Sequence, residues 1–281
     1  MTPSHVTEVP IRMGANRKAP LLMGILNVTP DSFSDGGLYD SVSQAVEHAS
    51  YLVDSGAQIV DVGAESSRPG ARAISVQEEW SRLEPILVAL QPLRQSVLLS
   101  LDSQKPEIML KAASIGIDVI NDIGGKTSLQ DLKSLAKNPR MHYIAMHMEG
   151  TPETMQVSPL KSAVVCEKVE AFFKVSLDKA LAAGFEPERI WLDPGIGFGK
   201  TDAANIALMA AVRNWSELYQ IAVGVSRKSL MGRYLGIEAP QDRDPPSKML
   251  ELGLALLGAR LIRTHDVAAL RRLTQLMQGD G

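Results

Sequence analysis

Residues 21–37 read LLMGILNVTPDSFSDGG, and this stretch holds both signals on which the fold prediction depends. Its first part, LLMGILN at 21–27, is a short apolar run of the kind that forms a strand covered on both faces. Its second part, NVTPDSFSDGG at 27–37, is a polar loop containing two glycines, and a helical pattern begins near Ser41. A strand, a polar loop and a helix therefore follow one another in this order.

The same order recurs along the chain. Further short runs rich in Val, Ile and Leu lie at 58–63, 97–102, 118–122, 143–147, 190–193, 221–225 and 260–264. Helical periodicity separates them, over 41–57, 76–90, 105–115, 128–136, 162–185, 203–213, 247–258 and 266–277. About eight strand–helix units in 281 residues predict a single-domain α/β protein, a (β/α)8 TIM barrel. A doubly wound open sheet is the alternative.

The composition, 45% hydrophobic and 22% charged, is typical of one soluble globular unit. We expect residues 1–20, which are polar, to form an irregular lead-in and residues 21–281 to form the barrel domain. A net charge of -3 gives no basic footprint for nucleic acid. No apolar run approaches the roughly 20 residues of a membrane span, and the N-terminus has no apolar signal core. Cys166 is the single cysteine, which excludes an internal disulfide and favours a cytoplasmic protein.

Polar side chains follow every predicted strand. The strand ends carry Asn27, Asp61, Asp102, Asn121, Asp122, His147, Asp193, the segment 226–229 and the segment 263–266. In a barrel these carboxyl ends meet at one face, where barrel enzymes build their active sites. Folding alone does not explain so many polar groups, because each must be hydrogen-bonded or solvated. The sequence therefore predicts a functional site at this face.

Asp102, Asn121 and Asp193 are the candidates for binding a flat heterocycle. A carboxylate accepts two N–H donors and an asparagine offers both donors and acceptors, so the three would suit a ring with amino and amide edges. Each could instead cap a helix or a turn, and Asp193 before Pro194 is a common turn pair.

Arg68, Arg263 and His265 match the charge of a phosphate or diphosphate, although each could instead form a surface ion pair. Ser229 opens an apparent helix, whose free N–H groups would accept a carboxylate, or the serine is a plain cap. Lys228 precedes it and could serve either the ring or the charge.

The stretch GIGFGKT at 195–201 has the wrong spacing for a P-loop or for a dinucleotide fingerprint. Its glycines are better explained by close approach of the backbone to a flat ligand. No His/Cys cluster has zinc spacing, so a metal is expected to have oxygen ligands, as magnesium on a diphosphate would.

Taken together, the motifs resemble the dihydropteroate synthase family of the folate pathway over about residues 21–275. The matching stretches, in family order, are MGILNVTPDSFSDGG, DVGAESSRPGA, LDSQKPE, VINDIGG, AMHMEGTPETMQ, LDPGIGFGKT, VSRKSLMG and IRTHDV. The resemblance implies a homodimeric barrel that condenses 7,8-dihydropterin-6-ylmethyl diphosphate with 4-aminobenzoate, releases diphosphate and uses Mg2+. A corrinoid-type pterin methyltransferase, a non-catalytic pterin-binding protein and a phosphosugar barrel enzyme are the alternatives.

The resemblance also implies residue roles. The pterin site would comprise Asp102, Asn121, Met146, Asp193, Gly197, Phe198 and Lys228. The diphosphate site would comprise Asn27, Arg68, Arg263 and His265, with Asn27 also on the metal. The 4-aminobenzoate site would comprise Phe33, Ser67, Arg68, Pro69 and Ser229. The catalytic set would be Asn27, Asp35, Arg68, Lys228, Arg263 and His265.

Some positions depart from the family pattern. Ser67 and Ser103 stand where threonine is usual, Ala64 stands for a glycine, and DRDPPSKMLELG at 242–253 replaces a more regular stretch. The polar loop at 27–37 would open for substrates and then close to exclude water from a cation-like carbon. An aromatic amine attacks in its neutral form, so no strong general base is expected.

Overall fold

The computed structural model of the chain describes residues 19–29 and 38–276. Its strands are β1 (Leu21–Asn27), β2 (Ile59–Gly63), β3 (Leu98–Ser103), β4 (Val119–Asp122), β5 (His142–Met146), β6 (Ile190–Asp193), β7 (Ala222–Gly224) and β8 (Leu261–Thr264). All of their pairings are parallel, in the order β6-β5-β4-β3-β2-β1-β8-β7. Each strand lies within one residue of its predicted limits at both ends.

The sheet closes on itself at the two strands that end this order. A parallel bridge joins Leu192 of β6 to Ile221, just before β7, and the Leu192 amide donates to the Gln220 carbonyl at 2.9 Å. The predicted single-domain (β/α)8 barrel is therefore confirmed, and the open doubly wound sheet is wrong. Strands that follow in sequence lie side by side in space, as short right-handed β–α–β connections require.

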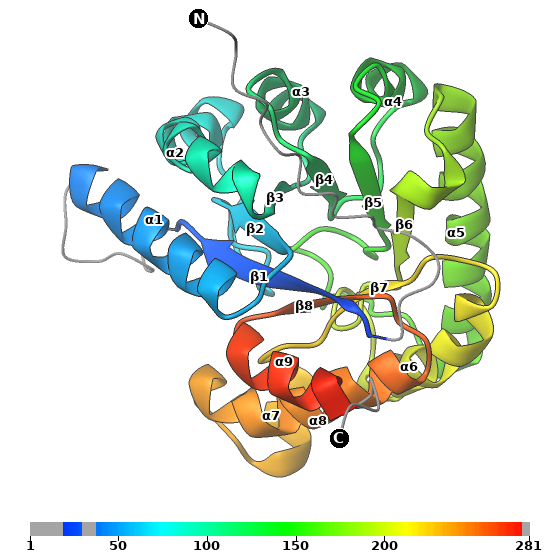
Figure 1. Ribbon diagram of the computed structural model, residues 1–281. Helices are drawn as coiled ribbons and strands as arrows, with labels where there is room; N and C mark the ends of the chain where they lie inside the picture. Colours follow the sequence, from blue (N-terminus) through cyan, green and yellow to red (C-terminus); the bar gives the residue numbers. More distant parts are fainter. Residues whose placement is uncertain (1–18, 30–37, 277–281) are drawn as a thin grey trace, which may run out of the picture.

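The helices form the outer ring around the strands (Figure 1). They are α1 (Leu38–Asp54), α2 (Val76–Ala89), α3 (Pro106–Ser114), α4 (Leu129–Ala136), α5 (Ser162–Ala183), α6 (Asp202–Ser216), α7 (Ser229–Leu235), α8 (Asp244–Leu256) and α9 (Val267–Gln275). Short 3-10 helices lie at 91–95, 187–189 and 240–243. No helix in the described part of the chain is long and apolar enough to cross a membrane.

Helix ends follow local capping chemistry. Ser75 caps α2 and Thr201 caps α6 through their hydroxyls, and Gly184 ends α5 with a positive φ of 104°. α8 begins three residues earlier than predicted, at Asp244. Its two prolines occupy the first turn, where a missing N–H costs no hydrogen bond.

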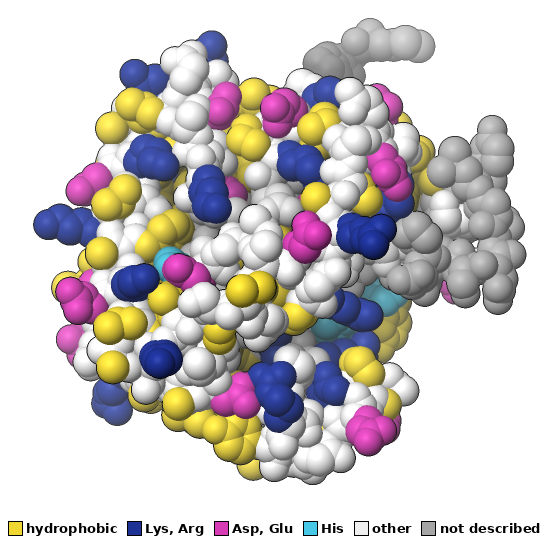
Figure 2. Space-filling view, turned by 180° about the vertical axis from the view of Figure 1, so that it is seen from behind, with side chains coloured by type: hydrophobic (Ala, Val, Ile, Leu, Met, Phe, Trp, Pro, Cys, Tyr) yellow, Lys and Arg dark blue, Asp and Glu magenta, His cyan; other side chains and the backbone are white. Residues whose placement is uncertain are grey.

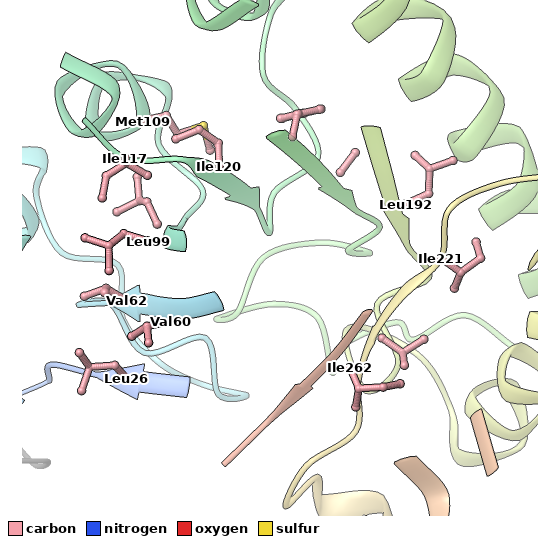
Figure 3. Close-up of a cluster of buried hydrophobic side chains, with 14 of the residues drawn as sticks. Leu26, Val60, Val62, Leu99, Met109, Ile117, Ile120, Leu192, Ile221 and Ile262 are labelled. Atoms are coloured by element: carbon pink, nitrogen blue, oxygen red, sulfur yellow. The ribbon is translucent and has the colours of Figure 1, made fainter. Parts of the chain in front are cut away.

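The apolar core has two layers, because neighbouring residues of a strand point to opposite faces. The inner cluster fills the barrel with Leu21, Met23, Ile59, Val119, Ile144, Trp191, Ala222 and Leu261. The outer cluster packs strands against helices and includes the labelled side chains of Figure 3, among them Leu26, Val60, Val62, Leu99 and Ile262. Burying each such aliphatic side chain contributes about 1.5–3 kcal/mol.

The same alternation decides which polar residues face inward. On β2, Ile59 belongs to the inner cluster, so Asp61 also faces inward; on β3, Leu98 packs against that cluster, and Asp102 follows at an even spacing. On β6, Trp191 is followed two residues later by Asp193. The polar side chains therefore stack above an apolar plug, at the carboxyl ends of the strands.

Candidate active site at the carboxyl ends of the strands

Asp61 lies at the centre of the inward polar layer. Its carboxylate accepts from Ser100 Oγ at 2.5 Å and from Asn121 Nδ2 at 3.1 Å, and Arg263 Nε donates to it at 2.6 Å. Arg263 Nη2 donates to Asp102 Oδ2, also at 2.6 Å. Side chains thereby join β2, β3, β4 and β8. Sequence reasoning noted Asp61 as a strand end but gave it no role, although its even spacing from Ile59 would have placed it inside.

Arg263 is held differently from the prediction. The sequence assigned it to an anionic ligand or to a surface ion pair, and the structure pairs it with two buried carboxylates of the site itself. Asp61 is fully buried and the side chain of Asp102 is 12% exposed. A diphosphate at this point would have to share the guanidinium with Asp61 and Asp102.

Burial moves the pKa values of three charged groups of the site towards neutrality. Burial raises the pKa of Asp102 to about 7, against the opposing charge of Arg263. Burial likewise raises the pKa of Asp193 to about 6, against the hydrogen bond from the Gly195 amide and the charge of Lys228. Burial and the charge of Arg263 lower the pKa of Lys228 to about 8. Titratable groups with such shifts are typical of functional sites.

The loop after β6 is shaped by Asp193 and Lys200. Asp193 Oδ1 accepts from the Gly195 amide at 2.7 Å. Asp193 therefore forms the turn that the sequence analysis gave as its alternative role, and it does so beside the site. Lys200 is buried, and its Nζ donates to the carbonyls of His147 at 3.1 Å, Gly195 at 2.9 Å and Phe198 at 2.8 Å. Sequence reasoning considered Lys200 only as the end of a false P-loop motif and missed this role.

Lys228 lies directly against that loop. Lys228 Nζ is 3.7 Å from the centre of the Phe198 ring, and a Cβ on Gly197 would lie 3.2 Å from Lys228 Cδ. Phe198 packs against the cluster that contains Met146, on β5. Apolar side chains of β5 and of this loop therefore lie beside the charged groups of Asp193 and Lys228. The structure brings together the whole set predicted for a flat heterocycle.

His265 follows β8 and contacts Ser226, which follows β7. Its backbone N–H donates to Ser226 Oγ at 3.2 Å, and its Nδ1 lies 3.0 Å from the same oxygen. Burial, together with the charges of Arg227 and Arg263, lowers the pKa of His265 to about 2. The ring is therefore neutral at pH 7. It would meet an anion as a hydrogen-bond donor and not as the cation that the sequence analysis expected.

The residues predicted for the second substrate are more exposed. Arg68 and Pro69 are exposed and Ser67 is half-buried, on the segment 64–75 between β2 and α2. The Gly70 amide donates to the Pro152 carbonyl at 2.9 Å, which ties this segment to the loop after β5. Basic side chains and histidine lie next to one another on the face shown in Figure 2.

Ser229 is the first residue of α7, where Lys228 is the N-cap residue. Its hydroxyl does not cap the helix, because it accepts from Arg233 Nη1 at 2.9 Å. Phe33 and Asp35 lie outside the described residues, so their predicted roles stay predictions.

Asn27 is exposed at the end of β1 and offers one amide oxygen. The described residues contain no group of three His, Cys, Asp or Glu side chains that could hold a metal ion. Magnesium usually keeps several waters and binds through one or two protein groups plus substrate phosphates. The amide oxygen of Asn27 beside a diphosphate would match this coordination. The residues present are therefore compatible with magnesium that enters bound to the substrate.

Comparison with known proteins places this geometry in a family. The model of the pterin binding enzyme family matches residues 23–265. The chain belongs to this family. Dihydropteroate synthase of Escherichia coli (strain K12) is 41% identical to this member of the family over 249 residues, covering 88% of this chain and 87% of the relative. The resemblance to dihydropteroate synthases is therefore confirmed.

Solved structures of this pterin-binding family agree with the sequence comparison. Xanthomonas albilineans dihydropteroate synthase with 4-aminobenzoic acid superposes with a TM-score of 0.84 at 38% identity, covering 93% of each chain. The same enzyme in complex with 7,8-dihydropteroate gives a TM-score of 0.81 at 36% identity and 93% coverage of each chain.

Proposed function

We propose that this chain catalyses the dihydropteroate synthase reaction, the condensation of 7,8-dihydropterin-6-ylmethyl diphosphate with 4-aminobenzoate. The observation that carries the proposal is the group of buried Asn121 and Asp193 and half-buried Asp102 and Lys228 at the carboxyl ends of the strands, in a chain of the pterin-binding family. The relatives named above match over most of the chain and are dihydropteroate synthases, which supports this reaction over methyl transfer to a corrinoid.

The carboxylates and the lysine would hold the pterin. Asp193 and Asp102 accept hydrogen bonds from ring N–H and amino groups, and Asn121 supplies one acceptor and one donor. Phe198 and Met146 cover the ring from the side, and Gly197 lets the backbone come close. Because Asn121 already bonds to Asp61 and Asp193 already accepts from the Gly195 amide, little reorganisation is needed when the ring enters.

The reaction would proceed by departure of diphosphate and attack of the aromatic amine. The bond from the methylene carbon to diphosphate breaks, the amine nitrogen bonds to that carbon, and the nitrogen then loses one proton. Arg263 stabilises the leaving anion. Ser226 lies against Nδ1 of His265, so the neutral ring can present its Nε2–H to the diphosphate.

Arg68 would bring a second cation from its loop, while Ser67, Pro69 and Ser229 would surround the benzoate. Magnesium is part of the proposal: held by Asn27 and the substrate, it would neutralise charge on the departing diphosphate. Its need is checked by chelation, which should abolish turnover and be reversed by added Mg2+.

A homodimer is also proposed. α7 and α8 carry large apolar side chains with much of their surface exposed, namely Tyr234 at 61%, Leu235 at 57%, Met249 at 78% and Leu256 at 67%. Exposed apolar groups on adjacent helices are typical of a protein interface. Sedimentation equilibrium should give twice the chain mass, and Met249→Glu should shift the protein to monomer. The cytoplasmic location stays a prediction from the single cysteine.

The direct test is an assay with the pterin diphosphate, 4-aminobenzoate and Mg2+. We expect equal amounts of diphosphate and 7,8-dihydropteroate, with neither formed when 4-aminobenzoate is left out. Diphosphate release that does not depend on the amine would contradict the proposal, as would methyl transfer from a methylated pterin to a corrinoid.

A further inference from the structure

Arg227 has a backbone conformation that ordinary side chains avoid. Its φ is 57°, and it is the one non-glycine residue with positive φ in the described ranges 19–29 and 38–276. This left-handed conformation is strained for an arginine, so it persists only where surrounding contacts enforce it. Such outliers are enriched at functional sites, and Arg227 lies in the connection between β7 and α7.

Four contacts enforce the conformation. Arg227 Nε and Nη2 donate to the two carboxylate oxygens of Asp244, each at 2.7 Å. The Arg227 amide donates to Ser247 Oγ at 3.0 Å, and its carbonyl accepts from Arg243 Nη1 at 3.2 Å. Ser247 Oγ in turn donates to the Arg243 carbonyl at 2.6 Å. Asp244 and Ser247 of α8, together with Arg243 just before the helix, therefore bind the side chain, the N–H and the C=O of Arg227.

The residues on either side of Arg227 serve the proposed site. Ser226, before it, holds His265 through two contacts to its hydroxyl. Lys228, after it, is directed over the Phe198 ring. A left-handed residue between them turns the chain, so both neighbours can face the barrel mouth while Arg227 itself turns towards α8.

We propose that Arg227 and Asp244 are positioning residues, whose bidentate pair fixes the turn that aims Lys228 and Ser226 at the substrate. This inference rests on the proposed function and deepens it. It also gives a use to the segment 242–253, which departs from the family pattern and contains Asp244. The charge of Arg227 acts in the same place, because it helps to lower the pKa of His265.

Two variants separate positioning from mere stability. Asp244→Asn keeps the shape but loses one charged hydrogen bond, and Arg227→Gly removes the pair while allowing positive φ without strain. The matched control is Asp118→Asn at the other end of the barrel, where Asp118 forms a comparable bidentate pair with Arg94. All three are measured for thermal unfolding and for calorimetric binding of 6-hydroxymethyl-7,8-dihydropterin, which lacks the diphosphate.

We expect Asp244→Asn and Arg227→Gly to weaken pterin binding by about tenfold, since small misplacements of a binding group are costly. The double variant should bind pterin no more weakly than the single variant with the lower affinity, because both changes break the same interaction. Asp118→Asn should lower the unfolding temperature and leave pterin binding unchanged. In turnover, the first two variants should raise KM for the pterin diphosphate and lower kcat together.

Wild-type pterin binding by Asp244→Asn and Arg227→Gly would overturn the inference, and so would equal weakening in Asp118→Asn. Binding is read without catalysis, so these outcomes stand even if the wild-type chain binds pterin but forms no dihydropteroate, which would refute the proposed function alone.

Discussion

The inward wall of the site and the segment 64–75 are built in opposite ways. The wall consists of strand residues whose side chains are buried and paired, such as Asp61 at 0% and Asn121 at 4% exposure. The segment carries Arg68 and Pro69 exposed to solvent. Half of the site is therefore preformed, and the other half depends on a connection held mainly at its ends.

Those ends are well anchored. The Ile74 amide donates to Glu65 Oε1 at 2.9 Å, and Lys105 Nζ bridges Glu65 at 2.8 Å and the buried Glu79 at 2.6 Å. The base of the segment is thus rigid while its middle contacts the loop after β5. The contrast implies that breaking an ion pair of the wall affects both folding and turnover, whereas changes in the segment affect turnover without affecting folding.

The largest effect is expected from Arg263→Ala. It leaves Asp61 and Asp102 as buried carboxylates without their partner, so unfolding free energy should fall by about 3–5 kcal/mol. Turnover of the diphosphate substrate should fall by more than about a hundredfold. Chemical denaturation and initial rates measure the two. Arg68→Ala is the control from the segment and should lower turnover with an unchanged unfolding midpoint.

His265→Ala extends the same test. Its effect on the diphosphate substrate should not add to that of Arg263→Ala, because both groups would hold one ligand. Binding of a pterin without diphosphate should be weakened far less by His265→Ala. Additive losses, or equal losses on both ligands, would remove His265 from the leaving-group role.

Asp193→Asn tests the wall without disturbing its fold. The asparagine keeps an acceptor for the Gly195 amide but replaces the second oxygen with a donor. Each charged hydrogen bond to the ring is worth about 1.5–3 kcal/mol, so pterin affinity should fall by at least about tenfold. Calorimetry measures the affinity, and the melting temperature should change little. An unfolded variant, or unchanged affinity, would show that Asp193 is only a turn residue.

The order of substrate binding tests the other half. If the benzoate pocket is completed by the segment 64–75 and the loop after β1, its closed form is a minor state of the free protein. The affinity of 4-aminobenzoate alone should then be reduced by about tenfold or more. Calorimetry should show clear binding once pterin, diphosphate and magnesium are present. Tight binding to the free protein would mean that both halves are preformed.

The pH dependence of pterin binding sharpens the assignment of charge. The pKa of Asp193 is raised to about 6, so the free protein takes up a proton as the pH falls below 6. The ring needs the ionised form, and affinity should therefore fall by about tenfold per pH unit below that point. The pKa of Asp102, about 7, would add a step above it. Asp193→Asn should lose the lower step and keep the upper one.

The smallest effect is expected from Ser67→Thr on the segment. A half-buried side chain gains one methyl group, which is worth at most about 0.8 kcal/mol, or about fourfold in affinity. Steady-state KM for 4-aminobenzoate measures it. A change of more than tenfold would mean that this part of the segment is packed as tightly as the wall.

The sequence was sufficient for the fold because each strand pattern is short, apolar and followed by a helical period. Every strand was placed within one residue, from Leu21–Asn27 to Leu261–Thr264. It was also sufficient to gather Asp102, Asn121 and Asp193, since the ends of parallel strands meet at one face, and the resemblance to the family added Lys228.

Contacts between distant side chains were beyond the reach of the sequence pattern. Nothing local links Arg263 to Asp61, or Arg227 to Asp244, and the partner decides what the charge does. The three carbonyl bonds of Lys200 depend on a folded loop that its glycine spacing could not describe. The neutral state of His265 follows from burial among cations, which no run of residues displays.

The parallel bridge between Leu192 and Ile221 is short compared with the register of five residue pairs between β1 and β2. This seam should therefore open first in native-state hydrogen exchange, while amides of β1 and β2 exchange through global unfolding. Asp193 and Lys228 stand on opposite sides of it. A pterin held between them would link β6 to β7, so the ligand should slow amide hydrogen exchange at this contact more than anywhere else in the barrel.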